Sequence, residues 1–128
     1  MTNLPIRTVV IHCSDSPHRG DTAEDIHAWH LQRGWVGIGY HYVITEFGEV
    51  EYGRPEYWVG SHVRNHNTKS LGICLIGRDT FTDKQMEALR TLVKDIKTRH
   101  GDKISVVGHR NLDPGKTCPN FDVKALGL

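Results

Sequence analysis

The chain has 128 residues, with 16 lysines and arginines against 15 acidic residues, which gives a formal net charge of +1. This length fits one ordinary domain, so we expect residues 1–128 to form a single domain. The near-neutral charge argues against a dedicated nucleic-acid binder, and three cysteines are too few for a disulfide framework. No apolar run is long enough to span a membrane and no secretory signal pattern begins the chain, so we expect a protein made in the cytoplasm.

The first half of the chain predicts a strand, a helix and a hairpin. Residues 7–12 are rich in β-branched side chains and indicate a buried strand. A helix is expected over residues 22–33, with a threonine as N-cap, acidic residues in the first turn and a glycine after its end. Residues 40–45 and 50–53 flank a short turn and predict a β-hairpin. The polar residues 58–69 then predict a long loop, which is typical of a functional segment.

The second half alternates strand and helix. Residues 71–76 are strongly apolar and predict a buried strand. Residues 82–85 have the pattern of a capping box, and apolar residues recur at helical spacing behind it, so a helix is expected to end near residue 99. Residues 104–108 indicate a further strand. The tail is rich in proline and glycine and is predicted as a loop, with one short helical turn after Asp122.

Strands that alternate with helices, together with one antiparallel hairpin, predict an α/β fold. We expect a three-layer domain in which a mixed central β-sheet is flanked by helices. The long second helix would cross over between two parallel strands. Ligand sites in such sheets favour the carboxyl ends of strands, and His12 and His109 each stand at such an end.

Three residues have the types and places for one metal ion: His12, His109 and Cys118. Two imidazoles and a thiolate leave the fourth position of a tetrahedral Zn²⁺ open, as in catalytic zinc sites. Such an ion lowers the pKa of a bound water and polarises a carbonyl group. Because the three residues are far apart in the sequence, the residues alone leave a plainer interpretation open, namely two core histidines and a buried thiol.

Six short motifs, in a fixed order, make the chain resemble a known enzyme family. They are Val10–Ser14, Gly39–Ile44, Gly60–His62, Asn67–Ile73, Gly108–Arg110 and Lys116–Pro119. The chain is similar to the zinc-dependent N-acetylmuramoyl-L-alanine amidases of the bacteriophage lysozyme type, which are related to the peptidoglycan recognition proteins. The resemblance extends from about residue 8 to residue 123. It implies the amidase and peptidoglycan-recognition fold, in a catalytic domain with no separate wall-binding domain.

The resemblance also implies roles for individual residues. His12, His109 and Cys118 match the zinc ligands of the family and imply one Zn²⁺ per chain. Tyr40 matches the tyrosine whose phenol faces the attacking water. Lys116 matches the lysine that helps to stabilise the tetrahedral intermediate.

The expected substrate contacts come from three further residues. His62 matches a histidine that lines the substrate groove of the family. Asn67 and Thr117 are candidates to donate hydrogen bonds to a stem peptide, with a loop-structuring role as the alternative. In the related cytosolic recycling amidases an aspartate replaces the cysteine ligand and a glutamate replaces the tyrosine, so Cys118 and Tyr40 favour the lysozyme-type branch.

The implied function is hydrolysis of the amide between N-acetylmuramic acid and L-alanine by a phage or prophage endolysin. We expect a monomer that accumulates in the cytoplasm and acts on the cell wall after release, with peptidoglycan as its partner and no nucleic-acid or membrane binding. The alternatives are a non-catalytic peptidoglycan-binding protein, a regulator that binds host RNA polymerase, and a cytosolic muropeptide-recycling amidase. Cys118 argues against the first, because non-catalytic relatives typically lack the cysteine ligand.

Most remaining cysteines, histidines and tryptophans receive structural interpretations. We expect Cys13, Cys74, His41 and Trp35 in the core, His27 and His30 beside a packed helix face, and His18 and His100 at the surface. His66 and Trp58 stay open between a substrate contact and a purely structural place.

Overall fold

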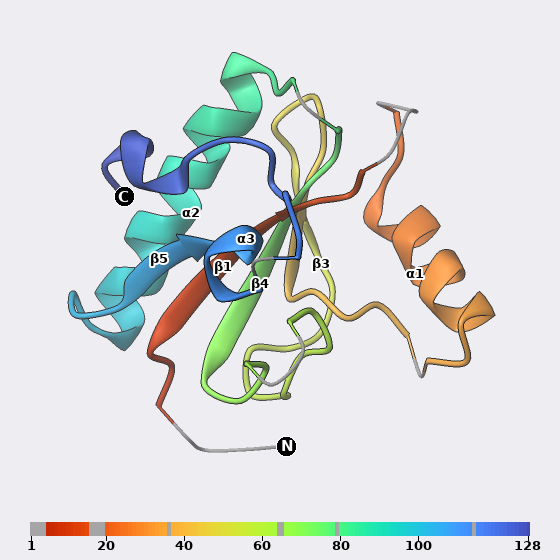
Figure 1. Cartoon of the computed structure of the whole chain (residues 1–128), viewed down its shortest axis with the longest axis horizontal. Coiled ribbons are helices and arrows are strands. Elements are labelled where there is room, and N and C mark those ends of the chain that lie inside the picture. Colours follow the sequence, from red (N-terminus) through yellow and green to blue (C-terminus); the bar gives the residue numbers. More distant parts are fainter. Residues whose placement is uncertain (1–4, 16–19, 36, 64–65, 79, 114) are drawn as a thin grey trace.

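The computed structural model describes residues 5–15, 20–35, 37–63, 66–78, 80–113 and 115–128 (Figure 1). His18, which we expected at the surface, lies outside these ranges. In chain order the elements are β1 (Thr8–Cys13), α1 (Ala23–Gln32), β2 (Tyr42–Ile44), β3 (Val50–Tyr52), β4 (Ser70–Leu75), α2 (Asp83–His100), β5 (Ser105–Gly108), α3 (His109–Leu112) and the 3₁₀ helix η1 (Val123–Leu126).

The five strands form one mixed sheet in the order β3-β2-β4-β1-β5. The β2–β3 hairpin is antiparallel, whereas the other neighbouring pairs are parallel. Strand β1 lies between β4 and β5, so that His12 pairs with Cys74 and Ile11 pairs with Gly108. The carboxyl ends of these three strands therefore meet at one edge of the sheet, where ligand sites of such folds lie.

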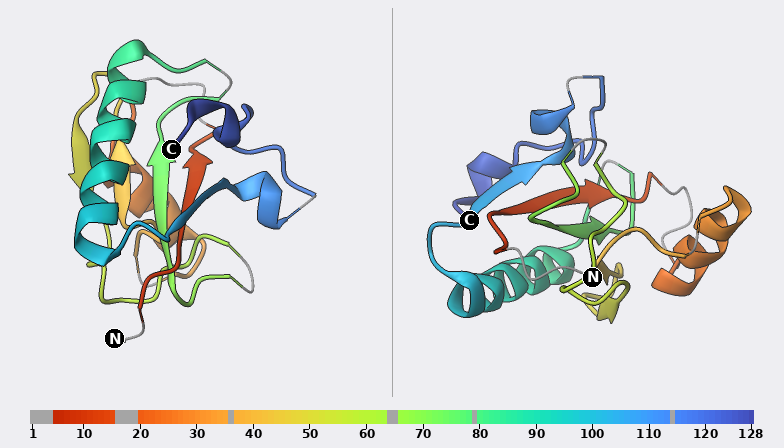
Figure 2. Two further views of the ribbon diagram at one scale, coloured as in Figure 1. Left: turned by 90° about the vertical axis from the view of Figure 1, so that its left-hand side faces the viewer. Right: turned by 90° about the horizontal axis from the view of Figure 1, so that it is seen from below.

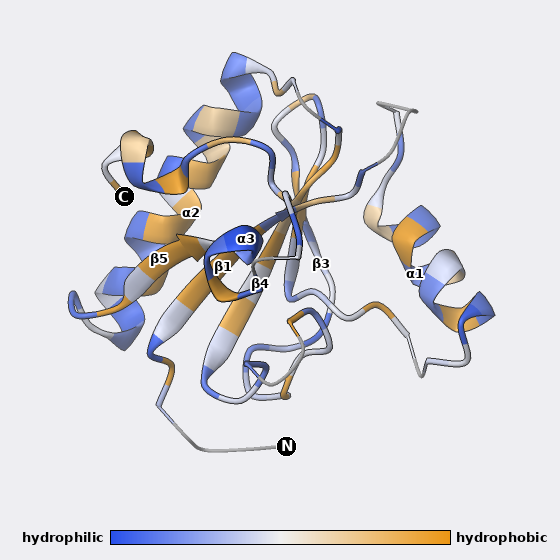
Figure 3. Ribbon diagram, viewed as in Figure 1, coloured by the Kyte–Doolittle hydropathy of each residue, from blue (hydrophilic) through white to orange (hydrophobic). Residues whose placement is uncertain are grey.

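Helices cover both faces of the sheet, which confirms the predicted three-layer α/β fold. Helix α2 runs along one face (Figure 2), and its buried Leu89 and Ile96 share a core with Ile11 and Ile73 of the strands. On the opposite face, Ile26 of α1 belongs to a smaller core that includes buried side chains of β2 and β4. The strands are largely apolar, while α2 carries alternating hydrophobic and hydrophilic bands (Figure 3). This pattern is that of a helix with one buried face.

The predicted capping box begins α2. The Thr82 side chain accepts a hydrogen bond from the Gln85 backbone N–H at 3.1 Å, and the Gln85 side chain accepts one from the Thr82 N–H at 2.8 Å. The Gln85 amide also donates to the backbone carbonyls of Ile76, at 2.8 Å, and Ile44, at 3.3 Å. The start of α2 is therefore fixed to the ends of two strands as well as capped.

Two stretches differ from the sequence prediction. Residues 40–41 precede β2: their carbonyls accept hydrogen bonds from Arg54 and Gly53, but they do not continue the strand ladder. His109 begins α3 instead of ending a strand, because the Asn111 side chain accepts from the Gly108 N–H at 2.8 Å and caps a short helix. The turn after Asp122 is confirmed as η1. No helix among the described residues is long and apolar enough to cross a membrane.

Candidate metal centre and active-site cleft

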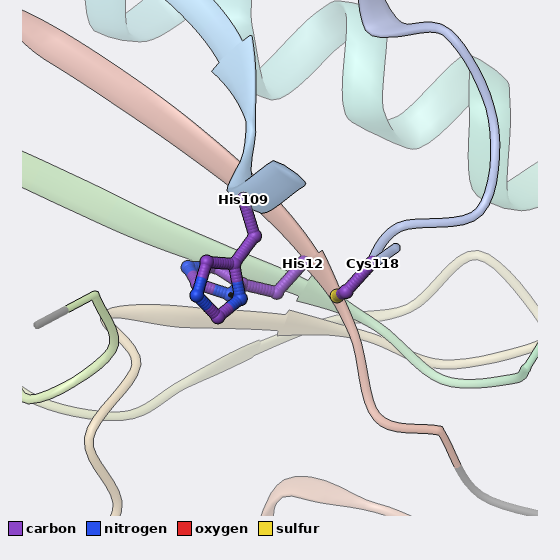
Figure 4. Close-up of side chains that lie close together, drawn as sticks. All are labelled: His12, His109 and Cys118. Carbon is purple, nitrogen blue, oxygen red and sulfur yellow. Dashed lines mark hydrogen bonds between the residues drawn. The ribbon is translucent and has the colours of Figure 1, made fainter. Parts of the chain in front are cut away.

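Three side chains converge at the carboxyl end of β1 (Figure 4). His12 comes from β1, His109 is the first residue of α3, and Cys118 lies in the loop that follows α3. One ligand atom from each lies within 4.8 Å of the others, and the two Nδ1 atoms of His12 and His109 are 3.2 Å apart. In the described part of the chain this is the one group of three or more His, Cys, Asp or Glu side chains with such spacing.

The sheet brings these residues together. Strands β1 and β5 are parallel neighbours, so His12 and His109 both follow the Ile11–Gly108 pair. The Cys118 loop is then held by two hydrogen bonds of 2.8 Å: the Arg110 N–H donates to the Cys118 carbonyl, and the Cys13 N–H donates to the Cys118 sulfur. The separation in sequence is therefore bridged by strand pairing and by the loop's own backbone contacts.

The donor set fits a zinc ion. Zn–N bonds of about 2.0–2.1 Å at a tetrahedral angle place two nitrogens about 3.3 Å apart. The observed distance between the His12 and His109 Nδ1 atoms is 3.2 Å. Two imidazoles and one thiol are also the ligand types that a catalytic zinc site with one open position uses.

The imidazoles of this cluster are held neutral. Burial, followed by the neighbouring His62 and His109, lowers the pKa of His12 well below its usual range, and burial also lowers the pKa of His109. The hydrogen bond with the Cys13 thiol, together with burial, raises the pKa of Cys118. A metal ion would therefore find nitrogen lone pairs ready to bind, but it would have to displace the thiol proton.

Tyr40 lies beside His12. The two rings are 5.0 Å apart between centroids and tilted by 56°. Tyr40 is partly buried against the smaller core, and burial raises the pKa of its phenol, followed by the effect of the nearby cysteines. The hydroxyl group therefore stays protonated at neutral pH, and the Cys74 thiol is its hydrogen-bond neighbour.

A cleft in two parts lies against the cluster, with His109 and Cys118 in its lining. The larger part, about 620 Å³, is lined by Trp35, Ser61, His62, Val63, Asn67, His109, Asp113 and Lys116. The smaller part, about 340 Å³, is lined by Cys13, Ser14, Asp15, Tyr40, His109, Gly115, Lys116, Thr117, Cys118 and Asn120. His109 and Lys116 line both, so the two parts of the cleft adjoin at these two side chains.

The three expected substrate-contact residues all line this cleft. His62 also touches the metal cluster, because its Nδ1 lies 2.9 Å from the His12 Nε2. The Asn67 side-chain oxygen accepts from the backbone N–H groups of His62 and Val63, both at 2.8 Å, so this oxygen structures the loop. Substrate contact by Thr117, which is exposed, and by the Asn67 amide stays a prediction.

Most histidines outside the cluster form hydrogen bonds with backbone groups. His27 and His30 accept hydrogen bonds from the Ile38 and Gly39 N–H groups at 3.0 and 2.9 Å, which confirms their structural interpretation. His41 is buried and bridges the Gly72 N–H and the Trp58 carbonyl, as expected for a core histidine. His66 and His100 are exposed.

Two of the structural interpretations need correction. The prediction that Trp35 lies in the core is wrong. Trp35 is partly exposed and lines the cleft, and its ring packs on the His30 ring with 4.4 Å between the centroids. Cys74 is fully buried, as expected. Cys13 is also buried, but it is not only a core residue: its backbone N–H donates to the Cys118 sulfur, its thiol is hydrogen-bonded with Cys118, and it lines the smaller part of the cleft. Trp58 is 47% exposed and lies away from the cleft, beside His27 and Arg54.

Comparison with known proteins places the chain in a family. Residues 2–121 match the N-acetylmuramoyl-L-alanine amidase family. The chain belongs to this family. It is 37% identical over 125 residues to the endolysin of Klebsiella phage KP32, a match that covers 91% of this chain and 82% of that endolysin.

Solved structures of amidases and recognition proteins share the fold. The N-acetylmuramoyl-L-alanine amidase LysC from Clostridium intestinale superposes with a TM-score of 0.87 at 30% identity, covering 97% of this chain and 84% of LysC. A Drosophila PGRP-LB mutant in complex with tracheal cytotoxin superposes with a TM-score of 0.85 at 28% identity, covering 97% and 80% of the two chains. The predicted family is thereby confirmed, and the chain is an amidase of the endolysin kind.

Sequence reasoning missed one residue that contacts a neighbour of the cluster. Ser70, the first residue of β4, is buried, and its hydroxyl lies 3.2 Å from the His62 Nε2. A lone serine at the start of an apolar strand gives no sign of this contact. The contact depends on where the loop that carries His62 lies relative to β4.

Proposed function

We propose that this amidase is zinc-dependent and hydrolyses the amide between N-acetylmuramic acid and L-alanine in peptidoglycan. The observation that carries the proposal is the convergence of His12, His109 and Cys118 within 4.8 Å at the end of β1, beside a cleft that His109 and Cys118 line. These residues would hold the ion. When bound, zinc would activate a water molecule and polarise the amide carbonyl.

The chain's own residues would supply the other requirements of amide hydrolysis. Lys116 presents an exposed ammonium group beside His109, where it would stabilise negative charge that develops on the carbonyl oxygen. The neutral Tyr40 phenol, beside His12, would orient the attacking water or move a proton. Buried His12 would remain an uncharged ligand throughout.

The two-part cleft supports an extended substrate. A glycan strand with its stem peptide would occupy both parts and expose the scissile amide at the junction formed by His109 and Lys116. With a net charge of only +1, wall binding would rest on this cleft more than on long-range attraction to an anionic wall. We further propose a single catalytic domain that acts on the cell wall after release from the producing cell.

Metal analysis and activity together test this proposal. Wild-type protein is expected to bind one zinc per chain, to lose activity on chelation and to regain it with Zn²⁺. Cys118→Ser should weaken zinc binding and activity together, since a hydroxyl is a poorer zinc ligand than a thiolate. His100→Gln, at the far end of α2, is the matched control for zinc content. Full activity after verified metal removal would refute the zinc mechanism.

A further inference from the structure

A chain of hydrogen bonds leads from the loop before β4 to the metal cluster. The Ser70 hydroxyl lies 2.6 Å from the His66 carbonyl oxygen and 3.2 Å from the His62 Nε2. The His62 Nδ1 lies 2.9 Å from the His12 Nε2. The other nitrogen of His12, Nδ1, faces the His109 Nδ1 at 3.2 Å. The His66 carbonyl, the Ser70 hydroxyl and the rings of His62 and His12 are thus linked in series. The series ends at His12, a candidate metal ligand.

The direction of each bond follows from the first. A carbonyl oxygen only accepts, and the Ser70 oxygen has one proton, which it donates to a backbone carbonyl, either that of His66 or that of Asn67 at 3.2 Å. Towards His62 the serine oxygen must therefore accept, so the His62 Nε2 carries a proton. In a neutral imidazole the His62 Nδ1 is then the acceptor, and the His12 Nε2–H is the donor.

We propose that His62, anchored by Ser70, is a positioning residue that fixes His12 in the tautomer and ring orientation that a metal ion requires. With its proton held on Nε2, His12 presents the Nδ1 lone pair towards His109 and Cys118. This inference rests on the metal site put forward as the proposed function. It gives His62 a role in addition to lining the cleft.

The surroundings of His62 hold its ring in place. Its backbone N–H is bound by the Asn67 side chain at 2.8 Å. Its ring packs closely against two glycines: a Cβ atom would lie 2.7 Å from the ring if added to Gly72 and 2.6 Å from it if added to Gly60. The ring therefore has little freedom to turn away from His12, which is the property that an orienting partner needs.

Three substitutions at His62 separate positioning from simple space filling. Asparagine keeps an acceptor oxygen near the place of Nδ1 and loses the contact with Ser70. Glutamine reaches the place of Nε2 and offers no atom at Nδ1, although its volume is closer to that of histidine. Leucine has neither polar group. Since loss of an outer partner typically costs 10–100-fold in metal affinity, we expect His62→Gln and His62→Leu to weaken zinc binding by that factor. His62→Asn should stay within a few-fold of wild type.

The readouts are the zinc dissociation constant, from competition with a chelator, and the visible absorption spectrum of the Co²⁺-substituted protein. Altered Co²⁺ bands in His62→Gln and His62→Leu, with wild-type bands in His62→Asn, are expected. His66→Ala is the matched control for metal affinity, because only its backbone carbonyl takes part. Ser70→Ala leaves the His62 ring in place but lets it carry its proton on either nitrogen, whereas the asparagine oxygen can only accept. Ser70→Ala is therefore expected to weaken zinc binding about 10-fold, and it keeps the test valid if a His62 variant does not fold.

The outcomes distinguish this inference from the proposed function. Zinc affinity and Co²⁺ spectra that are unchanged in His62→Leu and Ser70→Ala would overturn the positioning role while leaving the metal site intact. Tighter zinc binding by His62→Gln than by His62→Asn would also overturn the positioning role. The volume of the side chain at residue 62 would then matter more than a hydrogen-bond acceptor for the His12 Nε2–H. A wild-type protein that binds no zinc would contradict the proposed function itself.

Discussion

Lys116 stands where the two parts of the cleft meet, and its side chain is exposed. Because its ammonium group is placed to stabilise charge on a reacting carbonyl oxygen, Lys116→Met is expected to lower kcat about 10²–10³-fold. Zinc content should not change. Steady-state kinetics and metal analysis measure both. Lys124→Met, at an exposed lysine of η1, is the control and should keep full activity. Equal activity of the two variants would rule out this role for Lys116.

Tyr40 contacts His12 through its ring and lines the smaller part of the cleft. Tyr40→Phe keeps the ring and removes only the hydroxyl. Activity should fall about 10²–10⁴-fold, the usual contribution of a proton-transferring group, while zinc affinity stays near that of wild type. Tyr52→Phe, at a tyrosine that is 78% exposed on β3, serves as the control. If Tyr40→Phe were as active as Tyr52→Phe, the hydroxyl would have no part in the reaction.

At the scale of secondary structure elements, Glu56, in the loop after β3, connects α2 with β2. Its carboxylate accepts two hydrogen bonds from Arg99, at 2.7 and 2.8 Å, and one from His100 at 2.7 Å, both at the end of α2. The hydroxyl of Tyr42, on β2, also donates to it. Burial alone would raise the pKa of Glu56, but the hydrogen bonds from Arg99, Tyr42 and His100 outweigh it and lower the pKa to about 2.

The sign of the resulting pH dependence follows directly. A carboxyl group whose pKa is lower in the folded state stabilises that state above its unfolded pKa of about 4.5, and this stabilisation is lost as the pH falls towards 2. Glu56→Gln is therefore expected to lower the free energy of unfolding by about 1–2 kcal/mol at pH 7, after allowance for the partial exposure of Arg99. The difference from wild type should shrink between pH 4.5 and pH 2.

Denaturant unfolding at several pH values measures this difference. Asp95→Asn breaks the exposed Asp95–Arg99 pair on the same helix and should cost less than about 0.5 kcal/mol. A pH-independent difference between Glu56→Gln and wild type would mean that the lost charge is not its cause.

Local sequence patterns predicted those helices and strands that are specified by nearby residues. The capping box and the helical spacing behind it predict α2, and the turn between β2 and β3 predicts the hairpin. Helix α3 was missed because it depends on one side-chain bond, from the Gly108 N–H to Asn111, within a segment whose composition indicates a loop. The contact of Cys13 with Cys118 was missed for a related reason. Alternation along the strand predicted that the Cys13 side chain faces away from the site, whereas its backbone N–H and its thiol both contact Cys118.

At the scale of the whole molecule, the candidate site depends on the parallel pairing of β1 with β5. The sequence could indicate His12, His109 and Cys118 as ligand types, and the order of motifs could indicate the family. Their proximity required the strand order of the sheet. The link from Ser70 through His62 to His12 lay beyond sequence reasoning, because it joins β4, a loop and β1 across the sheet edge.

Because its ligands come from both ends of the chain, a bound metal should stabilise the whole domain. Free zinc at about 100 times its dissociation constant adds about 2.7 kcal/mol to the free energy of unfolding, which corresponds to a rise in Tm of roughly 10 °C. Thermal unfolding with chelator and then with excess Zn²⁺ measures the rise. Mg²⁺, which prefers oxygen ligands, should give none. A Tm that is the same with chelator and with Zn²⁺ would contradict a zinc site built from these three residues.

The central claim is that the cleft hydrolyses the bond between the lactyl group of N-acetylmuramic acid and L-alanine. Mass spectrometry of purified peptidoglycan digested with the wild-type protein tests it most directly. We predict stem peptides with new L-alanine amino termini and glycan strands without new reducing ends. New reducing sugar ends, with no newly freed L-alanine amino groups, would contradict the claim and identify a glycosidase instead.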